Sequence, residues 1–393
     1  MAEKNNIIVG LDIGTTKISV IVAKKSEDGN FEILGTGKSV SNGVMRGEVA
    51  NIDKTVEAIK SAVTEAENNS SYEITEVYAG IAGSHIKSMQ HRGILTRENS
   101  QEEITNRDVK HIIRDMHKLA MEPGMQIIHV IPQEYFVDGL PAGNDPVGMC
   151  GSRLEADFHI ITGKTAAAHN IERSIKKAGL KMVGLILEPL ASAASALDPQ
   201  EKEAGVVLVD IGGGTTDIAI FTDGIIRHTA IFPFAGEYIT QMIQNKLKLR
   251  YEAAKKLKES PNATCAMYKH IPENKILTVN NLTGLPPVQI QQRYYCRLIN
   301  ACLEQIFNQV KNEIAGSYYK NKLNAGIVVT GGGAMIPNMK NFVEQFTGYH
   351  AQIGLPISRL ANLQDKSYAQ TIYSTSIGLA LLAADNENDY IFE

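Results

Sequence analysis

One short pattern occurs twice in this chain, and it constrains the fold more than any other feature. An apolar run ends in Asp and Gly followed by paired Thr, first at residues 8–17 (IVGLDIGTTK) and again at residues 207–217 (VLVDIGGGTTD). Each copy predicts a buried strand that turns at glycine into a second strand, over residues 17–22 and 217–221. We therefore expect two similar hairpins facing each other, one in each half of the chain.

The residues of these turns suit the binding of nucleotide phosphates. Glycine lets a ligand approach the backbone closely, exposed N–H groups can donate to phosphate oxygens, and threonine adds hydroxyl donors. One copy alone would be weak evidence, because such a turn needs no ligand, but two could hold one triphosphate between two domains. The candidate residues are Gly14, Thr15, Thr16, Gly212, Gly213, Gly214, Thr215 and Thr216.

Charged residues beside the turns are candidates for binding a metal ion and phosphate. Asp12 and Asp210 precede the turns, and we expect them to orient hydrated Mg²⁺, which prefers hard oxygen ligands and keeps much of its water. Lys17 has two interpretations: a point charge that reaches a β- or γ-phosphate, or a solvated strand residue.

A third glycine turn, Gly331, Gly332 and Gly333, follows an apolar strand at residues 326–330 and precedes a predicted helix at about residues 338–347. Without Cβ atoms, the backbone there can lie against a flat base or ribose. This turn therefore predicts contacts with adenosine.

Composition indicates a globular protein and gives no sign of nucleic-acid binding, of a membrane-spanning segment or of a cysteine metal site. With 393 residues and 44% hydrophobic content, the chain can form two or three domains with substantial cores. The net charge of −4 gives no indication of a nucleic-acid partner. No apolar run approaches the roughly 20 residues that span a bilayer. Cys150, Cys265, Cys296 and Cys302 show no metal-binding spacing, and we expect reduced structural thiols.

In this order, the three turns resemble the phosphate 1, phosphate 2 and adenosine motifs of the actin, Hsp70 and sugar kinase superfamily. Small-residue segments at Glu188–Ala194 and Ser376–Ala380 resemble its two connecting helices. The resemblance implies an α/β, actin-like (ribonuclease H-like) two-domain fold with an inserted α+β subdomain, and ATP and Mg as cofactors.

The resemblance also implies catalytic roles for Glu188, Asp210 and Asp217. Glu188 matches a carboxylate that helps to position metal or water in Hsp70-type ATPases, although a carboxylate that only stabilises a helix N-terminus is an equal interpretation. Asp217 lies where relatives place a group near the attacking water. Phosphoryl transfer depends mainly on positioning and charge neutralisation, so geometry rather than residue identity would set the rate.

Four further residues resemble ribose- and base-contacting segments of these relatives. They are Gly236 and Glu237, with Glu252 and Lys255 in a predicted helix at residues 251–256. The alternative is that Glu252 and Lys255 form an exposed i,i+3 pair, worth about a few tenths of a kcal/mol.

An inserted α+β unit between residues 84 and 163 narrows the resemblance. Apolar spacing predicts a helix with Val109, Ile112, Met116 and Leu119 on one side, and strands at residues 125–131 and 154–160. Two stretches in this unit, residues 129–139 (HVIPQEYFVDG) and 145–156 (DPVGMCGSRLEA), resemble the FtsA family of bacterial cell-division proteins. The resemblance to this family extends over essentially the whole chain.

We expect four subdomains: 1A (1–83, 164–198 and 370–393), 1C (84–163), 2A (199–238 and 311–369) and 2B (239–310). In 1A, Asp53 is expected to cap a helix that runs through Glu67. In 2B, Arg293, Tyr294, Tyr295 and Arg297 are candidate contact residues, because aromatic and Arg side chains are over-represented at interface hot spots.

The family resemblance implies an ATP-binding protein with slow or negligible turnover. Such a protein polymerises, binds the C-terminal peptide of FtsZ, tethers FtsZ to the inner face of the cytoplasmic membrane at the division site, and recruits later division proteins. It is expected to be cytoplasmic and peripheral on that membrane, with no nucleic-acid partner.

The end of this chain departs from the family pattern. FtsA reaches the membrane through a basic amphipathic C-terminal helix. Residues 383–393 are acidic, and no Lys or Arg follows Lys366, so anionic lipid would repel them. We expect membrane contact only through such a helix, which these residues do not supply, and weak direct membrane binding by the 393 residues.

Two alternatives come from the same superfamily. A sugar kinase begins with a similar motif, but the absence of Trp gives no evident sugar pocket. An actin-like ATPase of type IV pilus assembly shares the nucleotide fold and docks a different peptide; the stretch at residues 129–139 favours division instead. A chaperone of the Hsp70 type would need a substrate-binding domain after the second connecting helix, where little chain remains.

Overall fold

The computed structural model describes residues 7–26, 29–263, 268–281, 286–357, 359–361 and 368–385. Cys265 and the tail at residues 386–393 lie outside these ranges. Among the helices within them, none combines the length and apolar character that crossing a lipid bilayer requires.

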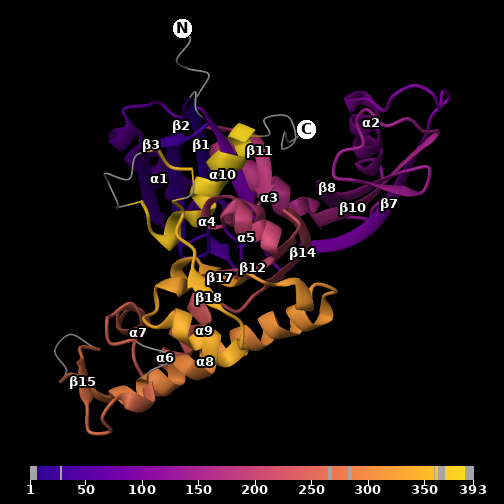
Figure 1. The fold of residues 1–393 in the computed structure, drawn as a ribbon. Coiled ribbons are helices and arrows are strands. Elements are labelled where there is room, and N and C mark those ends of the chain that lie inside the picture. Colours follow the sequence, from indigo (N-terminus) through magenta and orange to yellow (C-terminus); the bar gives the residue numbers. More distant parts are fainter. Residues whose placement is uncertain are drawn as a thin grey trace.

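Two five-stranded sheets form the centres of the two halves of the molecule (Figure 1). The strands of the first half are β1 (Ile7–Ile13), β2 (Lys17–Lys25), β3 (Phe31–Val40), β6 (Glu76–Ile81) and β11 (Lys181–Leu187). Those of the second half are β12 (Val206–Ile211), β13 (Thr216–Thr222), β14 (Ile225–Phe232), β17 (Gly326–Thr330) and β18 (Ala351–Ile353).

Both sheets have the same topology. Their orders are β11-β6-β1-β2-β3 and β18-β17-β12-β13-β14. In the first sheet β1 pairs antiparallel with β2, and β2 pairs antiparallel with β3, while β6 and β11 lie parallel on the other side of β1. In the second sheet β12, β13 and β14 pair antiparallel in the same way, and β17 and β18 lie parallel on the other side of β12. The repeated motif of the sequence therefore lies at the same place in both sheets, at the turns β1–β2 and β12–β13, as predicted.

Helices cover both faces of the first sheet. Alternate residues of a strand point to opposite sides, and in β1 both sides carry apolar side chains that need to be buried. Val9 and Leu11 of β1 pack with α1 (Ile52–Ser70) and α3 (Thr165–Lys177), whereas Ile8 packs with α10 (Ser374–Asp385). The cap expected for α1 is wrong, because the helix begins one residue after Asn51 and Asp53 already lies in its first turn. Asn51 has an extended backbone, and its side-chain Oδ1 accepts from Lys54 N at 3.0 Å.

Two helices connect the halves. The predicted connecting helices are α4 (Glu188–Ala196) and α10, which pack against each other at the centre of the molecule (Figure 1). Their contact is close because both carry small residues: a Cβ added at Gly378 would lie 1.7 Å from the carbonyl oxygen of Ala191. On its other side, α4 packs through Ala193 and Ala196 against the second sheet.

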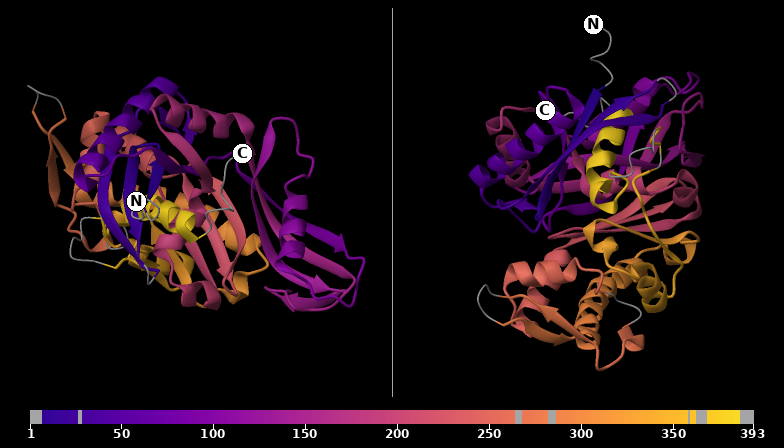
Figure 2. Two further views of the ribbon diagram at one scale, coloured as in Figure 1. Left: turned by 90° about the horizontal axis from the view of Figure 1, so that it is seen from above. Right: turned by 90° about the vertical axis from the view of Figure 1, so that its left-hand side faces the viewer.

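The inserted unit is a four-stranded sheet with one helix, and it projects sideways from the first half (Figure 2). Its sheet has the order β7-β10-β8-β9. Its helix ends at Met116, so Leu119 is not on it as predicted but packs beside it as a partly buried residue. The elements are β7 (Lys87–Thr96), α2 (Asn106–Met116), β8 (Met125–Val137), β9 (Leu140–Gly143) and β10 (Arg153–Lys164).

The second half carries a further group of helices on its sheet. They are α6 (Gly236–Leu247), α7 (Tyr251–Lys258), α8 (Gln292–Gly316) and α9 (Met339–Thr347), with a hairpin of β15 (Ile276–Val279) and β16 (Val288–Gln291). Tyr295 of α8 is fully buried and donates to Leu257 O at 2.8 Å, so this candidate contact residue is not accessible at the surface. Tyr294, its neighbour on the helix, is exposed.

Short elements complete the described fold. They are β4 (Val44–Met45), β5 (Glu48–Val49), α5 (Pro199–Ala204), and 3-10 turns at Tyr268–His270, Lys320–Lys322, Gly332–Met335 and Thr371–Tyr373.

Candidate functional site

A cavity of about 680 Å³ lies between the two halves, where the turns of the two hairpins meet. The third glycine turn and the starts of α6 and α10 complete its wall. The predicted site residues that line it are Asp12, Gly14, Thr15, Thr16, Lys17, Glu188, Asp210, Gly212, Gly213, Gly214, Thr215, Asp217, Gly236, Glu237, Lys255, Gly331, Gly332 and Gly333.

The two hairpin turns touch each other across this cavity. A Cβ added at Gly214 would lie 2.2 Å from the hydroxyl oxygen of Thr15, and one at Gly213 would lie 2.5 Å from that of Thr16. Glycine is therefore required on the second turn because threonines of the first turn occupy the adjacent space. Thr15 also accepts from the backbone N–H of Gly47 at 3.1 Å, which fixes a neighbouring loop at the rim.

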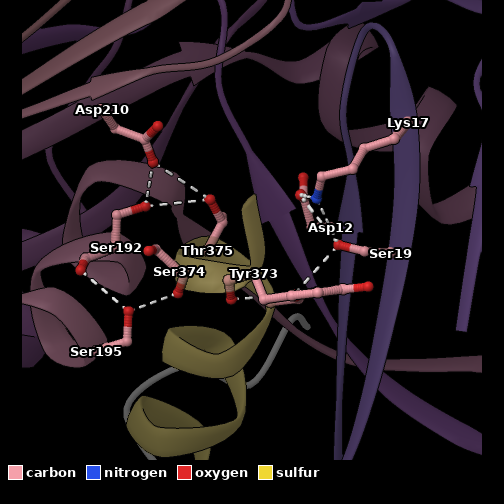
Figure 3. Close-up of polar contacts among 10 residues, drawn as sticks. Asp12, Lys17, Ser19, Ser192, Ser195, Asp210, Tyr373, Ser374 and Thr375 are labelled. Carbon is pink, nitrogen blue, oxygen red and sulfur yellow. Dashed lines mark hydrogen bonds and ion pairs between the residues drawn. The ribbon is translucent and has the colours of Figure 1, made fainter. Parts of the chain in front are cut away.

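Asp12 lies in a network of polar groups at the end of β1 (Figure 3). Lys17 Nζ donates to Asp12 Oδ2 at 3.3 Å and to Ser19 Oγ at 2.9 Å. Ser19 in turn lies 3.3 Å from the same carboxylate oxygen and 3.1 Å from Ser376 Oγ of α10. Lys17 is thus an ion-pair partner of Asp12 that lines the cavity, rather than a fully solvated strand residue.

Asp210 lies at the corresponding place on β12 and contacts hydroxyl groups instead of a lysine (Figure 3). Its Oδ2 accepts from Ser192 Oγ at 2.5 Å and from Thr375 Oγ1 at 3.4 Å. Burial raises the pKa of Asp210 to about 6; the hydrogen bond from Ser192 opposes this shift and the charge of Asp12 adds to it.

Two more carboxylates lie close enough to influence one another. Burial, and then the charge of Asp210, raises the pKa of Asp217 well above its usual range. Burial, and then the charges of Asp12, Asp217 and Asp210, raises the pKa of Glu188 in the same direction. Oδ1 of Asp217 is buried without a hydrogen-bond partner among the described residues. A bound cation would relieve both the repulsion and this unpaired oxygen.

These groups fit a hydrated cation better than a directly coordinated one. Within the described ranges, no three His, Cys, Asp or Glu side chains stand close enough together to hold a metal ion between them. Mg²⁺ commonly keeps several waters and takes only one or two carboxylates together with phosphate oxygens.

The structure does not bring two of the predicted residues to the cavity wall. Thr216 is fully buried and its hydroxyl donates to Phe234 O at 2.5 Å, which ties β13 to the segment before α6. Glu252 is exposed on α7, whereas Lys255, one turn later, lines the cavity. The i,i+3 spacing of the pair therefore does not bring both side chains to the same site.

Several residues that line the cavity were not predicted from the sequence, among them Lys258 and Tyr251. Lys258 Nζ donates to Gly236 O at 3.0 Å and to Thr240 Oγ1 at 2.9 Å, and burial lowers its pKa. Tyr251 donates to Glu237 Oε2 at 2.8 Å; burial, and then this bond, raises its pKa. One feature of the sequence could have indicated Lys258: it lies three residues after Lys255, so the two lysines share a face of the helix.

Comparisons with known proteins identify relatives along the whole chain. Residues 83–162 match a family model described as "SHS2 domain inserted in FTSA", and residues 207–378 match "Cell division protein FtsA". The cell division protein FtsA of Pseudomonas aeruginosa is 35% identical over 98% of this chain and 91% of its own length. That of Borreliella burgdorferi is 35% identical over 96% and 90%, and that of Escherichia coli K12 is 33% identical over the same shares.

Solved structures show the same fold at low sequence identity. The PilM-PilN type IV pilus biogenesis complex aligns with a TM-score of 0.70 at 13% identity, covering 96% of this chain and 98% of that one. MreB5 of Spiroplasma citri bound to ADP aligns with a TM-score of 0.58 at 13% identity, covering 98% and 99%. These matches, with the inserted SHS2 domain, confirm the predicted actin-like two-domain fold.

Proposed function

Because the chain belongs to the FtsA family of cell-division proteins, we propose that it is an actin-like division scaffold that binds Mg-ATP between its two halves. The observation that carries this proposal is the pair of glycine hairpins that face each other across the cavity, each with an aspartate at the end of its first strand. MreB5 of Spiroplasma citri, which has the same fold, forms crystals bound to ADP and to AMPPNP, and this supports a nucleotide in this cavity.

Each group of residues has a distinct proposed role. Backbone N–H groups of the two hairpin turns bind the phosphates, with Lys17 supplying positive charge. The third glycine turn, Gly236, Glu237 and Lys255 contact the adenosine. Asp12 and Asp210 hold the hydrated Mg²⁺, which supplies charge neutralisation on the phosphates. Glu188 and Asp217 position the water at the γ-phosphate end, and we propose slow turnover.

The partners proposed for this chain follow from the family rather than from the site. We propose that it forms filaments with copies of itself, binds the C-terminal peptide of FtsZ through subdomain 2B, and recruits later division proteins. Tethering to the inner face of the cytoplasmic membrane would use a C-terminal amphipathic helix. The four subdomains 1A, 1C, 2A and 2B, with the bounds given above, are part of this proposal.

Nucleotide binding is tested by titrating a fluorescent ATP analogue with and without Mg²⁺. We expect Asp12→Asn and Asp210→Asn each to weaken Mg-dependent binding about tenfold or more. Asp115→Asn is the matched control. Asp115 lies on α2 of the inserted unit, so the substitution removes the same charge at a place away from the cavity. Equal binding by all three variants and the unaltered protein would reject the site.

Partner binding is tested by fluorescence anisotropy of a labelled FtsZ C-terminal peptide, in Mg-ATP, with a scrambled peptide as control. Saturable binding that depends on the peptide sequence supports the division scaffold. If ATP binds but the peptide does not, even at high protein concentration, the result contradicts the division scaffold and favours a pilus-assembly ATPase or a sugar kinase of the same fold.

A further inference from the structure

The carboxylate of Asp210 is held by hydroxyl groups of both connecting helices. Ser192 of α4 donates to Oδ2 at 2.5 Å, Thr375 of α10 lies 3.4 Å from the same oxygen, and the two hydroxyl oxygens are 3.1 Å apart (Figure 3). Two hydroxyl groups, one from each connecting helix, therefore contact the same carboxylate oxygen.

The other side of this carboxylate is closed by backbone. A Cβ added at Gly331 would lie 2.1 Å from Asp210 Oδ1, so the glycine turn packs directly against that oxygen. A carboxylate confined on both sides cannot rotate freely, and the hydrogen bond from Ser192 at 2.5 Å is shorter than that from Thr375 at 3.4 Å. Ser192 is fully buried and does not line the cavity itself.

We propose that Ser192 is a positioning residue for the nucleotide-bound metal ion, which acts by fixing the orientation of the Asp210 carboxylate. The inference deepens the proposed nucleotide site and rests on it. Groups that hold the ligands of a metal ion commonly change its affinity 10- to 100-fold when they are removed, because the ligand loses its fixed orientation.

The same turn of α10 also reaches the other aspartate. Thr375 contacts Asp210, and the next residue, Ser376, lies 3.1 Å from Ser19 Oγ, which contacts Asp12 at 3.3 Å. The two carboxylates, one from each half, are therefore linked through one turn of the helix that joins the halves.

A matched control residue lies one turn from Ser192. Ser195 is on the same helix, is fully buried, and donates to Ser374 O at 2.6 Å and to Ser192 O at 3.2 Å. None of these acceptors is a carboxylate. Ser195→Ala therefore removes a buried hydroxyl of the same network, whereas Ser192→Ala also removes the bond to Asp210.

The test is a Mg²⁺ titration of the full chain at a fixed low concentration of fluorescent ATP analogue, paired with analogue affinity in EDTA. We expect Ser192→Ala to raise the half-saturating Mg²⁺ concentration about tenfold with unchanged affinity in EDTA, and Ser195→Ala to change neither. The urea unfolding midpoints of both variants should fall by similar amounts, which separates stability from metal binding.

Two results would overturn the proposal. One is an unchanged Mg²⁺ requirement in Ser192→Ala. The other is equal loss of affinity with and without Mg²⁺, which would assign Ser192 a purely structural role. If the unaltered protein binds no nucleotide under any condition, the proposed function itself fails and this inference falls with it.

Discussion

At the scale of single residues, four of the carboxylates that line the cavity, Asp12, Glu188, Asp210 and Asp217, differ because their surroundings differ. Asp12 has a lysine as its partner, Asp210 has two hydroxyls, and one oxygen of Asp217 is buried without a hydrogen-bond partner among the described residues. Burial among like charges raises the pKa of Asp210, Asp217 and Glu188. Such clusters are typical of sites where a cation or phosphate completes the charge balance.

Gly331 tests how closely the glycine turn must approach this cluster. It has φ of 80°, and its Cβ would lie 2.1 Å from Asp210 Oδ1. We expect Gly331→Ala to destabilise the protein by about 2 kcal/mol, because both the backbone conformation and the contact resist a side chain. The measurement is the urea unfolding free energy.

Gly332→Ala is the control for stability alone. The nearest heavy atom to its added Cβ is a methyl of Ile372 at 3.8 Å, an ordinary contact distance. Equal unfolding free energies of the two variants would contradict the close contact between Gly331 and Asp210.

At the scale of elements, the contact between α4 and α10 depends on residues without bulky side chains. Gly378 of α10 lies against the backbone of Ala191, and Gly10 of β1 lies under the same helix, where a Cβ would be 2.2 Å from Ser376 O. Close packing of this kind lets the two helices bring the hydroxyls of Ser192 and Thr375 within reach of Asp210. The helices thus determine both the joint between the halves and the geometry of the site.

We expect Gly378→Ala to destabilise the protein by about 2–3 kcal/mol, because its Cβ would lie 1.7 Å from the carbonyl oxygen of Ala191 and neither backbone can shift cheaply. Thermal and urea unfolding both measure this.

Gly316→Ala, at the end of α8, has no atom within 4 Å of the added Cβ. That variant should be neutral or more stable by up to about 1 kcal/mol, since alanine favours helix. Similar losses in both variants would argue against close α4–α10 packing.

At the scale of the whole molecule, the inserted unit also touches the second half through buried polar contacts. Gln133 of β8 donates to Ile226 O of β14 at 2.7 Å, and His159 Nε2 of β10 lies 3.2 Å from Thr229 Oγ1 of the same strand. His159 is 1% exposed. Burial, and then the charge of His228, lowers the pKa of His159 to about 4, so the ring is neutral in the folded protein at neutral pH.

This shift predicts how stability changes with pH. Because the folded pKa of His159 is about 4 against an ordinary 6.5, the unfolded chain binds the proton first, and stability falls as pH drops from 6.5 towards 4. At pH 5.5 the loss from this residue should be about 1.4 kcal/mol.

The measurement is the difference in unfolding free energy between pH 7.5 and pH 5.5, in the unaltered protein and in His159→Gln. The glutamine keeps a hydrogen-bonding side chain that does not titrate. We expect the variant to lose about 1.4 kcal/mol less over this range. An identical loss in both proteins would show that His159 is not the group that titrates.

The sequence by itself determined the two hairpins, the third glycine turn, the two small-residue helices and the inserted unit, because each depends on the local order of apolar residues and glycine. It also indicated both aspartates, which lie at fixed positions relative to those turns. Only the tertiary structure decided which side chains meet. Ser192 and Thr375 are 183 residues apart yet share one carboxylate. Thr216, Glu252 and Tyr295 are directed away from their expected roles by the elements packed around them. Spacing along one element fixes a face, but what that face meets depends on distant segments.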